Sequence, residues 1–162
     1  MSIVVRDYTA ADVPAMIAVW NEVVEEGVAF PQEECLTPES GARFFSEQTR
    51  CGVAADGAGR VVGLYILHPN NVGRCGHIAN ASYAVASESR GRHVGEALVR
   101  DCLAAARQHG FSILQFNAVV ATNVAARRLY ERLGFSQLGT IKNGFRMDGG
   151  RYEDICPYYK TL

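Results

Sequence analysis

The chain has 162 residues, of which 48% are hydrophobic and 20% are charged, and its formal net charge is −1. This length suits one domain spanning residues 1–162 and is short for two. The near-zero net charge excludes a sequence-wide electrostatic attraction to nucleic acid or to a membrane surface, so we expect a small-molecule partner.

The cysteines and the apolar stretches indicate where the protein works. The five cysteines are odd in number and include no CxxC pair, which is typical of free thiols rather than of a disulfide framework or a metal site. No stretch approaches the roughly 20 apolar residues that span a bilayer, and the N-terminus lacks a signal-peptide pattern. We therefore expect a cytoplasmic protein without a bound metal.

The chain begins with a strand pattern at Ile3–Arg6, followed by a capping-box signature made by Thr9 and Asp12. Apolar residues then recur at helical spacing, which predicts a helix that ends near Glu25. A loop over 26–36 follows it.

A second helix is predicted by Thr37, a preferred N-cap residue, and by Pro38 at the first helical position. Phe44 and Phe45 are expected to face the core from this helix. The Asp56–Gly59 cluster that comes next reads as a hairpin turn.

Apolar runs after the second helix predict six further strands. These are Cys51–Ala55, Val61–Leu67, His77–Val85, Ile113–Val119, Ser136–Ile141 and Tyr152–Tyr158.

Helical patterns interrupt these strands at Gly91–His109 and at Asn123–Leu133, with Gly110 and Gly134 where C-terminal caps belong. A strand, helix, strand order implies that the Tyr83 and Phe116 strands pair in parallel, between antiparallel neighbours. The fold class is therefore α+β, with a mixed, mostly antiparallel sheet and about four helices.

The turn before the third helix contains Arg90, Gly91, Arg92 and Gly95, between a predicted strand and a helix. Unpaired N–H groups and the helix dipole can hold a pyrophosphate at such a place, and glycine lets the backbone come close. The alternative is an ordinary strand-to-helix turn, which this segment alone does not exclude.

Two linked motifs resemble the GNAT superfamily of acetyl-coenzyme A-dependent N-acetyltransferases. Residues 90–95 are similar to its [QR]-x-x-G-x-[GA] signature, with His93 in place of the usual middle glycine, and residues 123–135 are similar to N-x-x-A-x-x-L-Y-x-x-L-G-F. The histidine is expected to change the affinity for the coenzyme rather than the way in which the coenzyme binds.

The resemblance implies acetyl-CoA as cosubstrate and assigns a set of residues to it. Tyr130 is expected to protonate the departing thiolate, and Asn123 is expected to bond the coenzyme or to order water. A backbone N–H near Tyr83 would stabilise the oxyanion. The whole coenzyme set is Tyr83, Ala84, Val85, Arg90, Gly91, Arg92, His93, Val94, Gly95, Glu96, Asn123 and Tyr130.

Two narrower resemblances concern the acceptor. Residues 21–25 are similar to phosphinothricin acetyltransferases, and short segments within 65–139 are similar to azetidine-2-carboxylate acetyltransferases, which detoxify proline analogues. They imply that Asn80 and Asn117 bond the carboxylate or the amine of an amino acid or a toxic analogue. His77 is the third candidate substrate-binding residue. Each asparagine is equally consistent with a structural role, in which its amide is hydrogen-bonded within the protein.

The base that takes the amine proton is left open. His77 has a suitable residue type, although a lone histidine at a strand start is more often structural. A water chain ending on Glu33 or Glu34 is the other possibility. Direct attack in a ternary complex is expected, with an acyl-cysteine route through Cys75 as the minor alternative.

Two other functions compete with a small-molecule acetyltransferase. The fold permits a protein or peptide N-acetyltransferase, because activity resides in the acceptor site. A non-catalytic coenzyme A sensor is the third reading, suggested by His93 and opposed by the intact Asn123 and Tyr130. The family resemblance also implies a possible homodimer, with aromatic residues near the C-terminus at a candidate interface.

Overall fold

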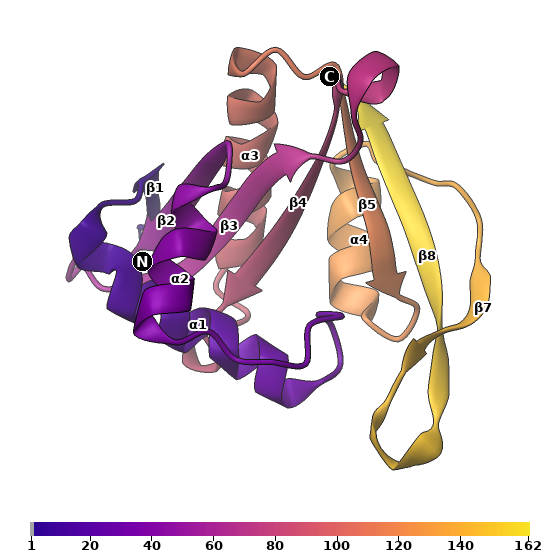
Figure 1. The fold of residues 1–162 in the computed structure, drawn as a ribbon, viewed down its shortest axis with the longest axis horizontal. Helices are drawn as coiled ribbons and strands as arrows, with labels where there is room; N and C mark the ends of the chain where they lie inside the picture. The colour runs from indigo at the N-terminus through magenta and orange to yellow at the C-terminus, as the bar shows by residue number, and fades with distance from the viewer. Residues whose placement is uncertain (1) are drawn as a thin grey trace.

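The computed structural model describes residues 2–162 and contains one eight-stranded sheet with helices on both faces (Figure 1). Helices α1 (Val13–Glu26) and α2 (Pro38–Ser46) cover one face, and α3 (Val94–Gln108) and α4 (Val124–Arg132) cover the other. This arrangement confirms the predicted α+β class with four α-helices. None of the helices in residues 2–162 is long and apolar enough to cross a membrane.

The sheet has the order β1-β2-β3-β4-β5-β8-β6, and β7 pairs with the free part of β8. In the part of the chain that the structure describes, only β4 and β5 run parallel, as the strand and helix order predicted. In chain order the strands are β1 (Val4–Asp7), β2 (Arg50–Ala55), β3 (Val61–Pro69), β4 (Ile78–Val85), β5 (Ile113–Val120), β6 (Ser136–Gln137), β7 (Ile141–Arg146) and β8 (Tyr152–Thr161).

Local sequence signals explain where the first two helical segments begin. Thr9 caps the short 3-10 helix Ala10–Asp12, which leads directly into α1, and Thr37 caps α2. The Asp12 carboxylate accepts the Thr9 N–H at 2.8 Å, and a two-pronged bond from Arg6 lowers the Asp12 pKa to about 2. Thr37 accepts the Ser40 N–H at 3.0 Å, directly before Pro38. Both predicted caps are therefore confirmed.

Each face of the sheet has its own apolar core. Trp20 of α1 and Phe45 of α2 are 1% exposed and pack together on one face, while Leu98 and Cys102 of α3 are fully buried on the other. Burying a side chain of this size contributes roughly 1.5–3 kcal/mol, so the helices are fixed by packing more than by their own propensity.

The predicted strand Ser136–Ile141 is wrong as a single element, because the chain leaves the ladder after β6 and resumes at β7. The Leu138 N–H donates to the Pro157 carbonyl at 2.8 Å, but Pro157 has no N–H to continue the pairing. The Gln137 side chain instead bonds the carbonyl of Gly139 at 2.9 Å. The predicted third helix likewise begins late, at Val94 rather than at Gly91.

The parallel strands β4 and β5 separate soon after they meet, as Figure 1 shows. They pair only where Ile78–Asn80 faces Ile113–Gln115. The pairing of β5 with β8 then shifts by one residue between Phe116 and Val119, which is a β-bulge that bends β5. Within residues 2–162, the edge of β4 that faces β5 has no strand partner beyond Asn80, and two cavities open near it.

Candidate active site

A cleft of about 680 Å³ lies where β4, α1, α3 and α4 approach one another, and we call it the α3 cleft. The sequence-predicted residues that line it are Tyr83, Val85, Arg90, Gly91, His93, Val94, Gly95, Glu96, Asn123 and Tyr130. Two other predicted residues do not line it: Ala84 is buried against the α1 side of the sheet, and Arg92 is exposed outside the cleft.

The turn before α3 presents backbone N–H groups to this cleft. Gly91 has a φ of 79° and His93 has a φ of 62°, so His93 adopts the left-handed conformation that a glycine would take. His93 is the N-cap of α3 but makes no side-chain capping bond. The first N–H groups of the helix therefore remain open to an anion, aided by the helix dipole.

The side chains of this turn are tied to α1 instead of being free. Both Nη atoms of Arg90 lie 2.7 Å from the Glu26 carboxylate, and this bond raises the Arg90 pKa. Glu22 accepts the N–H of Ser87 at 2.7 Å and its hydroxyl at 2.8 Å. Two acidic residues of α1 thus hold the turn, and the positive charge of Arg90 is already paired with Glu26.

Glu96 is also occupied by protein partners. It accepts hydrogen bonds from Arg100 on its own helix and from Arg132 of α4. Because Glu96 and Arg132 both line the α3 cleft, this ion pair links the two helices across one of its walls.

A second cavity of about 550 Å³, the α2 pocket, lies on the other side of the diverging strands. It is bounded by the loop after α1, by Phe44, Glu47 and Gln48 at α2, and by parts of β3, β4 and β5. Four residues line both this pocket and the α3 cleft: Ala29, Tyr83, Asn123 and Tyr130. The two cavities therefore meet at these side chains.

Tyr130 stands at this junction within an aromatic cluster. Its ring centroid lies 4.5 Å from that of Phe116 and 6.4 Å from that of Tyr83. Burial raises the pKa of the Tyr130 hydroxyl, so it stays protonated at neutral pH. A protonated hydroxyl between two cavities can give a proton to a leaving group held there.

Asn123 and Asn80 have structural partners as well as places in the cavities. The Asn123 Oδ1 accepts the Ala126 N–H at 3.3 Å and so caps α4. The Asn80 Nδ2 donates to the Gln115 carbonyl at 3.0 Å, at the last paired position of β4 and β5. This side chain thus bridges the two strands where they separate.

Asn117 lies in the β5 bulge, is exposed, and donates to the Asn70 Oδ1 at 2.7 Å. It lines the α2 pocket together with Asn80, so the structure brings the two predicted acceptor amides to one cavity. His77 is not brought there. It is exposed ahead of β4, at the far end of the strand from Tyr83.

Five polar residues of the α2 pocket were not predicted from the sequence: Gln32, Glu47, Gln48, His68 and Ser82. The predicted strand ended at Leu67, whereas β3 continues to Pro69 and pairs His68 with Asn80. The alternation of β3 places His68 on the face of Ile66, which was the available signal. Nothing in the sequence indicates that the end of α2 reaches this cavity.

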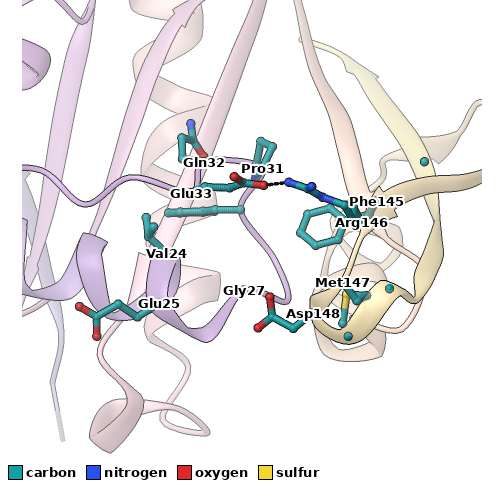
Figure 2. Close-up of a pocket in the computed structure, with 14 residues that line it drawn as sticks. Val24, Glu25, Gly27, Pro31, Gln32, Glu33, Phe145, Arg146, Met147 and Asp148 are labelled. Atoms are coloured by element: carbon teal, nitrogen blue, oxygen red, sulfur yellow. Dashed lines mark hydrogen bonds and ion pairs between the residues drawn. The ribbon is translucent and has the colours of Figure 1, made fainter.

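A third cavity, of about 800 Å³, lies between the loop after α1 and the hairpin of β7 and β8 (Figure 2). We call it the hairpin cavity. Glu33 and Arg146 point toward one another across it and form an ion pair. The loop residues Phe30, Pro31 and Gln32 line both this cavity and the α2 pocket, so the loop separates the two.

This placement bears on two of the predicted proton acceptors and on the cysteine route. Glu33 lines the hairpin cavity and not the α2 pocket, and Glu34 lines neither. Cys75 is exposed in the short helix Gly73–Cys75, outside both functional cavities. In the described part of the chain, no group of three or more His, Cys, Asp or Glu residues is arranged to hold a metal ion.

Residues 17–135 match the model of the acetyltransferase (GNAT) family. The chain is 30% identical over 147 residues to the L-methionine sulfoximine/L-methionine sulfone acetyltransferase of Pseudomonas aeruginosa, covering 87% of this chain and 84% of that protein. It is 38% identical over 89 residues to the N-acetyltransferase aca1 of Schizosaccharomyces pombe, where the match covers 55% of this chain and only 43% of the yeast protein.

Solved structures agree with this match. A GCN5-related N-acetyltransferase from Kribbella flavida superposes with a TM-score of 0.91 at 36% identity, covering 99% of this chain and 98% of that one. A phosphinothricin acetyltransferase from Sinorhizobium meliloti, solved in complex with AcCoA, has a TM-score of 0.92 at 24% identity, covering 100% of this chain and 89% of that one. At the latter identity the likeness shows the fold alone.

Proposed function

Since this chain belongs to the acetyltransferase (GNAT) family of enzymes, we propose that it transfers an acetyl group from acetyl-CoA to the amine of a small molecule. The observation that carries the proposal is the meeting of two cavities at Tyr83, Asn123 and Tyr130. One cavity has the features of an anion site, and the other is a polar pocket of small-molecule size.

The α3 cleft fits the coenzyme by its backbone. The left-handed turn at Gly91 and His93 and the uncapped start of α3 suit a pyrophosphate, which needs close N–H donors. The unpaired edge of β4 after Asn80 offers further backbone groups for an extended chain that carries amides. The S. meliloti enzyme, which shares this fold, was solved with AcCoA bound.

The chemistry follows from what the junction can supply. Acetyl-CoA, when bound, provides a thioester carbonyl that a neutral amine can attack. Backbone N–H groups of β4 near Tyr83 can donate to the carbonyl oxygen, and one such donor is worth about 3 kcal/mol in other acyl-transfer enzymes. Tyr130 Oη can deliver a proton to the departing sulfur. Positioning two reactants side by side supplies much of the remaining rate.

The acceptor is proposed to be a small amine because the α2 pocket holds about 550 Å³ and is walled by the loop after α1. Amino acids and their analogues are the first acceptors to test, since methionine sulfoximine and phosphinothricin appear in the names of the relatives. Removal of toxic amines, a reducing cytoplasmic location and a homodimer are further parts of this proposal. The five free thiols support the second.

The coenzyme-sensor alternative rested on His93, and the left-handed His93 backbone weakens it. Because His93 takes the conformation of a glycine, the turn keeps the shape that an anion site requires. We therefore retain the enzyme as the proposed function.

Thiol release from acetyl-CoA, followed with purified protein and a panel of amines, tests the proposal. Release that depends on one class of small amine, and that falls in a Tyr130→Phe variant, would support it. Tight coenzyme binding without release from any amine would favour the sensor. Release with peptides alone would move the function to protein acetylation.

A further inference from the structure

Two amide side chains of the α2 pocket, Asn80 and Gln48, have the same orientation. The Asn80 Nδ2 donates to the Gln115 carbonyl at 3.0 Å, and the Gln48 Nε2 donates to the Phe44 carbonyl at 2.9 Å. A carbonyl can only accept, so these bonds fix the amides with their nitrogens turned to the protein. Each amide has its Oδ1 or Oε1 left as an acceptor for a ligand.

His68 follows the same pattern. Its Nδ1 lies 2.9 Å from the Pro69 carbonyl, which requires Nδ1 to carry the proton. In the neutral ring, Nε2 then has a lone pair and acts as an acceptor. The side chain lies across from Asn80 in the β3 and β4 pairing, so two acceptor atoms come from adjacent strands.

The charged residues around the pocket also favour a ligand that is not an anion. Of the described residues that line the α2 pocket, none is Arg or Lys, and Glu47 is the one carboxylate among them. Across the loop, the hairpin cavity has Glu25, Glu33 and Asp148 against a single cation, Arg146, which is already paired with Glu33 (Figure 2). Both cavities beside the loop are therefore net acidic.

A free carboxylate finds no Lys or Arg among the described residues that line this pocket, and Glu47 would repel it. Proteins usually bind carboxylates with Arg or with several N–H donors, and burying one without a partner is costly. Here it would face Glu47 and the acceptor atoms of Asn80, Gln48 and His68. An ammonium or an amide N–H would instead find acceptors already in place.

We propose that the α2 pocket selects amines whose far end donates hydrogen bonds or carries no carboxylate, such as diamines and amino-acid amides, over the parent amino acids. This inference rests on the proposed acetyl transfer and names its acceptor class. The strand geometry allows the far end of such an acceptor to reach Asn80, because Asn80 and Tyr83 are three residues apart, or roughly 10 Å along β4. An acceptor with its amine at the junction can thus extend to Asn80 and His68.

The test compares methionine, methioninamide and 3-(methylthio)propylamine as acceptors in the thiol-release assay. Replacing the carboxylate by an amide makes the amine less basic, whereas removing the carboxylate makes the amine more basic. A preference for both methioninamide and 3-(methylthio)propylamine would therefore reflect the missing carboxylate rather than the basicity of the amine. We expect kcat/KM for both carboxylate-free amines to exceed that for methionine by about tenfold or more. Equal or better use of methionine than of both would overturn the inference.

Substitutions at Glu47 sharpen the test. Glu47→Gln should lower the kcat/KM preference for the carboxylate-free amines by about threefold, as expected for an exposed charge. Glu47→Arg should reverse the preference. Glu39→Gln, at the exposed start of the same helix, is the matched control and should leave the preference unchanged. A preference that is the same in all three variants would contradict the role of charge. No release from any amine would overturn the proposed function and this inference with it.

Discussion

The α3 cleft and the α2 pocket lie side by side, yet they are built differently. The cleft presents mainly backbone groups, in one continuous turn and the first turn of α3. The pocket presents side chains from α2, β3, β4 and β5, which are far apart in the sequence. A site made of backbone tolerates many side chains and keeps one ligand, whereas a site made of side chains can change its ligand by single substitutions. Conformation should therefore decide affinity in the cleft, and side-chain chemistry should decide selectivity in the pocket.

The largest expected effect is at the junction of the two cavities. Tyr130→Phe removes the hydroxyl but keeps the ring among Phe116 and Tyr83, so kcat should fall about a hundredfold while the coenzyme Kd stays the same. Steady-state kinetics and calorimetry measure the two quantities. Tyr152→Phe, on an exposed ring, is the control. A kcat within twofold of the wild type would remove Tyr130 from the chemistry.

The next prediction tests whether backbone conformation controls the cleft. Gly91→Val forces a branched side chain into a φ of 79°, although no atom lies within 4 Å of the added Cβ. The strain of about 1–2 kcal/mol should shift the turn and weaken coenzyme binding roughly tenfold. Gly57→Val, equally open but without a positive φ, is the matched control and should bind normally. Equal affinities in the two variants would contradict a backbone site.

A third prediction contrasts the two acceptor asparagines. Asn80→Ala removes the bond to the Gln115 carbonyl between the diverging strands and should lower the free energy of unfolding by about 1–2 kcal/mol. Asn117→Ala changes an exposed side chain in the bulge and should cost less than about 0.5 kcal/mol. Urea denaturation measures both. Equal costs would show that the two amides have the same structural role.

The smallest expected effect concerns the acidic residues that hold the α3 turn. Glu26→Gln removes a negative charge from the cleft and releases Arg90, so the coenzyme should bind about threefold more tightly, and less so in high salt. Glu22→Gln weakens the bonds to Ser87 and should loosen the turn, which lowers affinity by about the same factor. Calorimetry at two salt concentrations distinguishes them. If both variants changed the coenzyme affinity in the same direction, Glu22 and Glu26 would not have separate roles.

Sequence patterns predicted the cleft more completely than the pocket. Short-range signals such as the Thr9 and Thr37 caps, and the turn at Gly91, act within a few residues and were read correctly in position. The partner of Arg90 was not predictable, because Glu26 lies 64 positions away and only tertiary packing brings the two together. A motif thus located the turn without showing how its charges are used.

The pocket depended on features that short patterns do not carry. The bulge at Asn117 arises from the pairing of β5 with β8, and the break after Gln137 arises from Pro157 on a different strand. His68 was missed because β3 continues beyond the apolar run that defined it. His77, which was predicted as a base from its residue type, precedes β4 and lies at the opposite end of this strand from the junction at Tyr83. These are consequences of long-range register rather than of local propensity.

In the proposed reaction both cavities are filled together, and the amine attacks the acetyl group directly at their junction. Initial rates measured while acetyl-CoA and an accepted amine are varied independently test this mechanism. A ternary complex should give double-reciprocal lines that intersect. Parallel lines, with an acetylated protein isolated when the amine is omitted, would indicate a covalent intermediate and would contradict direct transfer.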